Sequence, residues 1–176
     1  MIGDRLPALT LWPEWAFAIA HLGKRVENRV WEPPRWLVGK WLAIHAGAHI
    51  GGRPGRVAVL EGLEAVRDEA ARAGVNVRPP LVPAAGEQLD LVVERPSGDV
   101  TLTVATRAIV CLARLSHVER VNVGPLSRPP WVVGPVCWRF DQVIPIEPVA
   151  IGGRQGVWDV PRPQLARVRA QIQEAR

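Results

Sequence analysis

The segment from residue 9 to residue 47 constrains the fold of this chain more than any other part of it. Two short apolar runs bound the segment, and a tryptophan-bearing helical pattern follows the first run. Between that pattern and the second run stands the charged sequence Lys24-x-x-Glu27-x-Arg29. Five of the eight tryptophans of the chain also fall within the segment. Dense charge beside dense aromatic surface is what a groove for a nucleotide or a nucleic-acid strand requires.

Proline and glycine divide this segment into predicted elements, which begin with a short strand at residues 9–11. Pro13 suits the first turn of a helix, where its missing N–H costs nothing, and Gly23 suits the end of that helix. Residues 25–31 alternate in character, which predicts a half-buried strand, and residues 41–45 predict another. On the strand at 25–31 we expect an inner face of Val26, Asn28 and Val30 and a polar, aromatic outer face of Arg25, Glu27, Arg29 and Trp31.

The rest of the chain predicts two more helices and several strands. The helices are expected at residues 55–73 and 163–176. The first carries an apolar stripe of Leu60, Leu63, Val66, Ala70 and Ala73. Residues 75–99 are rich in proline and glycine and are expected to form a loop or loose hairpin inserted into the fold. Further strands are predicted at 89–93, at 100–115 as one long strand, at 132–133, at 136–146 and at 156–160, with 116–130 as a connection.

The order of these elements indicates the fold class. At 176 residues the chain is most simply one domain. Many short strands with three helices favour an α+β fold that is mostly β, with a small and mainly antiparallel barrel and flanking helices. The helix between the first two strands would plug or flank one end of that barrel.

The composition limits the kinds of binding partner and the cellular compartment that we expect for this protein. The net charge is +5 and the pI is about 10.5, which favours a polyanionic partner, although a GC-rich genome produces the same arginine bias. Cys111 and Cys137 lie in apolar runs and are expected to be buried free thiols in a reducing cytoplasm. The first ten residues lack the regions of a signal peptide, and no apolar run approaches the roughly 20 residues of a membrane helix. We therefore expect a cytoplasmic protein that does not bind a membrane.

The sequence pattern of the 9–47 segment resembles the ASCH domain, a member of the PUA-like β-barrel superfamily. The family pattern has a Gln-Pro-Trp-Ala helix start, then Gly-x-Lys-x-x-Glu-x-Arg, a strand ending near His-Ala-Gly, and a Gly-Leu-Trp close to the end. Here the matching residues are Trp15-Ala16, the motif Lys24, Glu27 and Arg29, the run His45-Ala46-Gly47, and Gly156-Val157-Trp158. Pro13-Glu14 replaces Gln-Pro, and Gly23 stands one place nearer to the lysine than in the pattern. The resemblance covers most of the chain and is strongest in the first 50 residues.

The resemblance implies a site for single-stranded RNA or a modified nucleoside, in a cleft between the barrel and the first helix. Some related small proteins are amidohydrolases that act on N4-acylated cytidine. In them the active lysine lies where Lys24 falls, and a threonine lies at the position of Glu27. The change to glutamate separates this chain from those enzymes.

Each of the three charged residues admits a structural interpretation and a functional one. Lys24 follows a helix end, where it is a solvated turn lysine, a point charge for a phosphate, or a base if burial lowers its pKa. Glu27 and Arg29 lie two residues apart on one strand face, so they form an ion pair on the rim, or else bind a ligand. In the second case Glu27 accepts a hydrogen bond from a base edge or acts as general acid/base, and Arg29 holds a phosphate or stacks on a base.

Aromatic residues complete the predicted site. Trp31 is the best candidate for stacking because it continues the face of Glu27 and Arg29, whereas Trp15 would line the cleft from the helix. Trp158 would cover the same groove if the barrel closes. His45 has apolar neighbours, which is typical of a hydrogen-bonded core histidine. The predicted nucleic-acid-binding set is Trp15, Lys24, Glu27, Arg29, Trp31, His45 and Trp158.

Three functions follow as hypotheses. The primary one is a domain that binds RNA or a modified nucleotide in a basic, Trp-lined cleft. The alternative is a hydrolase of a modified cytidine or of RNA, with Lys24 and Glu27 as the pair that handles the proton. The third is a protein-binding domain with a Trp-rich surface. No cofactor or metal is expected, because no phosphate loop, dinucleotide fingerprint or acidic cluster is present. The oligomeric state is left open.

Overall fold

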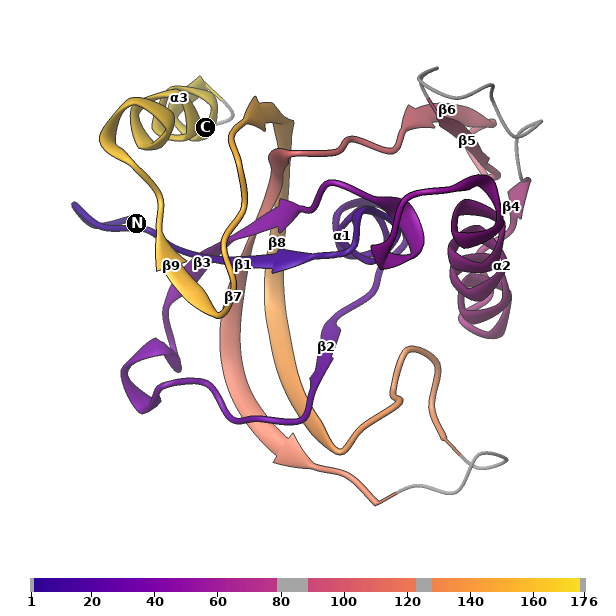
Figure 1. Ribbon diagram of the computed structural model, residues 1–176, viewed down its shortest axis with the longest axis horizontal. Coiled ribbons are helices and arrows are strands. Elements are labelled where there is room, and N and C mark those ends of the chain that lie inside the picture. The colour runs from indigo at the N-terminus through magenta and orange to yellow at the C-terminus, as the bar shows by residue number, and fades with distance from the viewer. Residues whose placement is uncertain (1, 79–88, 123–127, 175–176) are drawn as a thin grey trace.

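The computed structural model describes residues 2–78, 89–122 and 128–174 (Figure 1). Its elements in chain order are β1 (Pro7–Leu11), α1 (Pro13–His21), β2 (Val26–Arg29), η1 (Arg35–Leu37), β3 (Trp41–Ala46), η2 (Ile50–Gly52), α2 (Arg56–Arg72), β4 (Val77–Arg78), β5 (Asp90–Val93), β6 (Val100–Thr103), β7 (Ala108–Arg120), β8 (Val136–Ala150), β9 (Val157–Asp159) and α3 (Arg162–Glu174), with η marking short 3₁₀ helices.

The main sheet has six strands in the order β2-β8-β7-β3-β1-β9 and curves into a half-barrel (Figure 1). β1 pairs with β3 in parallel, and the other neighbours pair antiparallel. The expected α+β class with a barrel-like main sheet is thus confirmed. The barrel is open, because β2 and β9 are the two edges of the sheet and do not pair with each other.

The region expected to be a loop or loose hairpin contributes to a second, smaller sheet. β4 and β5 lie in it, and β6 follows, so that the three strands pair antiparallel in the order β4-β5-β6. Residues 79–88, between β4 and β5, lie outside the described part of the chain. The predicted strand at 89–93 is confirmed as β5.

Two predictions about the long strands were wrong. The expected strand at 100–115 is interrupted between β6 and β7, where the chain leaves the small sheet and Arg107 adopts a left-handed φ of +50°. β7 instead continues to Arg120, through residues expected to be a connection, and β8 extends to Ala150. Shifts of register between β7 and β8 break the alternation of side chains, so periodicity cannot find these strand ends. Residues 132–133, also predicted as strand, are not in a strand.

All three predicted helices are confirmed, although the stripe on α2 is rotated from the expected one. Its buried face includes Gly62 and Val66, whereas Leu60 and Ala73 are exposed. The rotation follows from the close approach of α2 to α1. A Cβ atom at Gly62 would lie 2.9 Å from Oε1 of Glu14, so the glycine must face α1.

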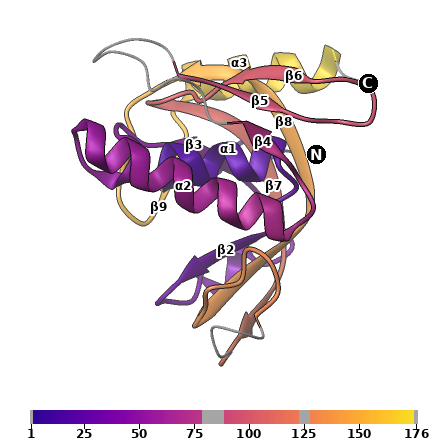
Figure 2. The same cartoon turned by 90° about the vertical axis from the view of Figure 1, so that its right-hand side faces the viewer.

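α1 forms the centre of the molecule. It packs against β3, β7 and β8 on one side and against α2 on another, and Figure 2 shows the two helices side by side. Apart from Trp15 and His21, its residues are buried. α3 packs on β8 and covers a separate apolar cluster with Trp158. Among the described residues, no helix is long and apolar enough to cross a membrane.

Candidate functional site

The turn after α1 directs Lys24 into the protein. Gly23 has a φ of +74°, which suits glycine, and the Lys24 N–H donates to the carbonyl of Ala18 at 3.2 Å. This helix end reverses the chain toward β2. The Lys24 ammonium group donates to the carbonyl of Val26 and is buried, which excludes the interpretation of Lys24 as a solvated turn lysine.

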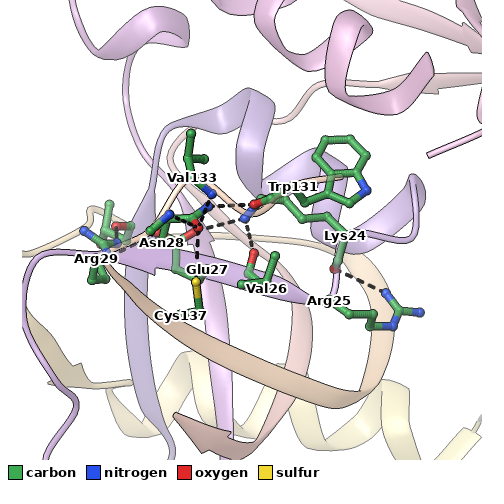
Figure 3. A network of polar contacts seen from close by, with 11 residues as sticks. Lys24, Arg25, Val26, Glu27, Asn28, Arg29, Trp131, Val133 and Cys137 are labelled. Atoms are coloured by element: carbon green, nitrogen blue, oxygen red, sulfur yellow. Dashed lines mark hydrogen bonds and ion pairs between the residues drawn. The ribbon is translucent and has the colours of Figure 1, made fainter. Parts of the chain in front are cut away.

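Lys24, Glu27 and Arg29 form one charged cluster (Figure 3). The distance from Lys24 Nζ to Glu27 Oε2 is 3.1 Å, and that from Arg29 Nε to Glu27 Oε1 is 3.0 Å. The exposed fraction of the side chain rises along the cluster, from 2% for Lys24 through 10% for Glu27 to 24% for Arg29. A molecule that approaches from solvent therefore meets Arg29 before the other two.

The faces of β2 differ from the prediction. Glu27, Arg29 and Trp31 do share one side, since the Arg29 guanidinium lies 5.8 Å from the Trp31 ring centre, but this side is turned inward. Val30, expected to face inward, is exposed, and Arg25 is exposed and donates to the carbonyl of Ile19. Val26 on the other face is buried as expected, so both faces of β2 are covered, and ion pairing allows the charged face to be buried.

Burial lowers the pKa of Lys24, while the neighbouring Glu27 carboxylate acts in the opposite direction. The Nζ atom also lies 5.9 Å from the ring centre of Trp15, within the range of a cation–π contact. A buried ion pair loses much of its hydration, so it contributes little net stability compared with an apolar pair. Buried charged groups with shifted pKa values are typical of functional sites, and they also occur in structural ion-pair networks.

The two predicted stacking residues are each held by a second tryptophan. The rings of Trp15 and Trp131 meet edge to face with centres 6.5 Å apart, and those of Trp31 and Trp138 meet in the same way at 4.9 Å. Trp138 also donates its indole N–H to the carbonyl of Trp31 at 3.2 Å. Both ends of the charged cluster are thus bounded by fixed aromatic rings.

Across the open side of the half-barrel, His45 and Trp158 are connected to the charged cluster through Thr10 of β1. Arg29 donates to the Thr10 carbonyl at 3.0 Å, and Trp158 donates its indole N–H to the Thr10 hydroxyl oxygen at 3.1 Å. The rings of His45 and Trp158 lie 5.6 Å apart. The structure therefore brings all seven predicted residues into one connected group, with Thr10 as a member that the sequence did not reveal.

His45 has the features of a core residue. Its side chain is buried, and its Nε2 atom lies 2.9 Å from the carbonyl of Ile151. Burial lowers the pKa of the ring, although this hydrogen bond opposes the shift. Its Nδ1 atom has no hydrogen-bond partner among the described residues. Position 153 requires glycine, because a Cβ atom at this position would lie 2.7 Å from His45 Nδ1.

Sequence reasoning missed Asn28, which holds the 128–134 segment over the charged cluster. The Asn28 amide donates to the carbonyl of Trp131 at 2.9 Å and accepts from the N–H groups of Val133 at 2.9 Å and Gly134 at 3.2 Å (Figure 3). An amide side chain at a position expected to face the core is the one signal that could have revealed it.

Glu69 of α2 holds the same segment from the other side. It accepts from the Trp131 N–H at 2.7 Å, and it pairs with Arg128 and, at 3.2 Å, with Arg72. Burial alone would raise the pKa of Glu69, but hydrogen bonds from Arg128 and Trp131 outweigh it and lower the pKa. Trp131 is thereby held with a φ of +67°, an uncommon value for a non-glycine residue, beside Trp15 and Lys24.

The inner end of the site is closed to solvent, since the Lys24 side chain is 2% exposed. Cavities of about 930 Å³ and 420 Å³ lie elsewhere, and no residue of the charged cluster lines either of them. The space between the half-barrel and α1, where a basic cleft is predicted, contains the side chains of Trp15, Lys24 and Glu27. The part of the site that solvent reaches is its outer end, at Arg29 and Trp31.

No group of three or more His, Cys, Asp or Glu side chains is placed to hold a metal ion in the described part of the chain. The two cysteines are free and buried, as expected.

No known family model matches this chain. A search of curated proteins also finds no similar sequence. The resemblance to the ASCH domain therefore stays a prediction from the motif residues.

Proposed function

We propose that this protein binds single-stranded RNA or a modified nucleotide at the outer end of the charged cluster. The observation that carries the proposal is the gradient of exposure from Lys24 to Arg29, with an aromatic ring at each end. Arg29 is the cation that a phosphate reaches, and Trp31 beside it offers an aromatic ring for a base.

The buried residues of the charged cluster hold Arg29 at its outer end in place. Glu27 pairs with both cations, and a hydrogen bond to the Thr10 carbonyl holds the Arg29 guanidinium in place. A guanidinium that is already oriented loses less conformational entropy when it binds a planar anion. Two cations around one carboxylate leave a net charge of +1 in the cluster, which favours an anionic ligand.

A fluorescence-anisotropy titration with labelled single-stranded RNA at two salt concentrations tests the proposal. Arg29→Ala is expected to weaken binding about tenfold and to reduce the salt dependence by about one phosphate contact. Arg67→Ala removes the same charge from the outer face of α2 and is the matched control. Equal binding by both variants would contradict the proposed site. Thermal unfolding of each variant separates a loss of binding from a loss of folding.

A hydrolase of a modified cytidine is the second candidate, because the pKa of Lys24 is lowered and its amine contacts Glu27. A neutral amine accepts a proton from an attacking water, and the pair returns it to the leaving nitrogen as the amide C–N bond breaks. Incubation with N4-acetylcytidine, followed by chromatography for cytidine and acetate, tests this candidate. Product from the wild type and none from Lys24→Met would establish an enzyme. No product from the wild type would reject this substrate.

A further inference from the structure

A second aromatic and basic surface lies at the far end of the loop that leaves β2. It surrounds the cavity of about 930 Å³, which we call the Trp36 cavity. The cavity lies where β1 and β3 begin and where β9 ends, because Pro7 pairs with Asp159 and Trp41 pairs with Arg114. It shares no lining residue with the charged cluster.

Two tryptophans face this cavity. Trp36 stands on η1 and is 58% exposed, and Trp41 at the start of β3 is half-buried beside it. An indole ring that is left this exposed is unusual, since burial of so large an apolar surface is favourable. Trp12 is similarly exposed, at 53%, but it lies outside the cavity and makes a matched control.

The cations around Trp36 differ in their pairing. Arg5 pairs with Asp159 and Arg114 pairs with Asp141, so these two guanidinium groups are already neutralised. Lys40 lines the cavity, and Arg35 precedes Trp36 on η1 without lining it; both are exposed, and neither forms an ion pair with any residue that the structure describes. Asp4 adds one carboxylate to the lining and contacts Arg169 at 3.3 Å. The positive charge available to a ligand is therefore next to the exposed ring.

We infer that the Trp36 cavity is a second contact site for single-stranded nucleic acid, in which Trp36 stacks on a base and Arg35 and Lys40 bind phosphates. The inference rests on the proposed function, because it places both contacts on one strand. Arg29 and Trp36 are seven residues apart, so the loop separates them by at most about 25 Å. A stacking ring with flanking cations is the usual means of binding such a strand without reading its sequence.

Strands of two lengths test the inference in the same anisotropy assay. Small single-strand-binding folds cover roughly 4–16 nucleotides, so a strand of about 12 reaches both contacts and one of about 3 reaches a single contact. Trp36→Ala is expected to weaken binding of the long strand about tenfold and to leave the short strand unchanged. Trp12→Ala should change neither, and Arg29→Ala should weaken both. Lys40→Ala should reduce the salt dependence for the long strand alone.

The outcomes separate the two proposals. If Trp36→Ala binds the long strand as well as the wild type does while Arg29→Ala weakens it, the inference is overturned and the proposed function stands. If Trp36→Ala weakens binding and Arg29→Ala does not, the cavity is a nucleic-acid site and the proposed function at Arg29 is wrong. If the wild type binds neither strand, the inference and the RNA-binding form of the proposed function are both overturned, and the exposed Trp36 is then a candidate for contact with a protein.

Discussion

The charged cluster and the Trp36 cavity use the same kinds of residue in opposite ways. In the cluster, Lys24 lies against Trp15 with a carboxylate at 3.1 Å and almost no exposure. In the cavity, Trp36 is exposed, and the neighbouring Lys40 has no carboxylate partner among the described residues. A tryptophan beside a cation therefore does not by itself define a role. Pairing and burial decide whether the charge acts within the fold or remains available to a ligand.

If this comparison holds, removal of Glu27 has the largest effect on stability. Glu27→Ala leaves Lys24 buried without its carboxylate, and loss of one partner of a buried pair costs about 3–5 kcal/mol. Urea unfolding measures the change. Glu61→Ala, which breaks the mostly exposed pair with Arg53, is the control and should cost less than about 1 kcal/mol. Equal losses for the two variants would mean that the cluster is no more important to the fold than a surface pair.

Removal of Asn28 is expected to have the next largest effect. Asn28→Ala leaves one carbonyl and two N–H groups of the 128–134 segment without their partner, which costs about 2 kcal/mol or more. The segment should then move away from α1, and the emission of Trp131 should shift to longer wavelength as water reaches it. Urea unfolding and tryptophan fluorescence measure the two effects. An unchanged emission spectrum would contradict a role for Asn28 in covering Lys24.

The dependence of stability on pH distinguishes a buried lysine from an exposed one. The pKa of Lys24 is lowered in the folded protein by burial, from 10.5 for an ordinary lysine. The unfolded chain therefore binds more protons between the lowered pKa and 10.5, and stability rises with pH across that window. The free energy of unfolding of the wild type should increase relative to Lys24→Met as the pH is raised toward 10.5. A constant difference between the two would mean that the pKa of Lys24 is not lowered.

Local signals explain which parts of the fold could be predicted from the sequence. Pro13 and Gly23 mark the ends of α1 because their backbone preferences act over one or two residues. The charged residues of β2 were expected on one face, and a spacing of two does place Glu27 and Arg29 together. The direction of that face depends on which residues of other strands meet it, which a single strand does not reveal.

The remaining features depend on contacts between distant residues. Asn28 and Trp131 are 103 positions apart, and Glu69 and Trp131 are 62 apart, so no local pattern links them. The ends of β7 and β8 were missed because shifts of register disrupt the alternation that marks a strand. Such features follow from the packing of the whole chain.

The smallest expected effect on stability is at the Trp36 cavity. Arg35→Ala and Lys40→Ala remove exposed charges without a carboxylate partner among the described residues, so each should change the free energy of unfolding by less than about 0.5 kcal/mol. Urea unfolding measures this change, and nucleic-acid binding is measured on the same samples. A stability loss comparable to that of Asn28→Ala would mean that these cations serve the fold. Unchanged stability with a weaker salt dependence of binding would show that the unpaired cations beside Trp36 bind a ligand, whereas the buried pair of Lys24 and Glu27 stabilises the fold.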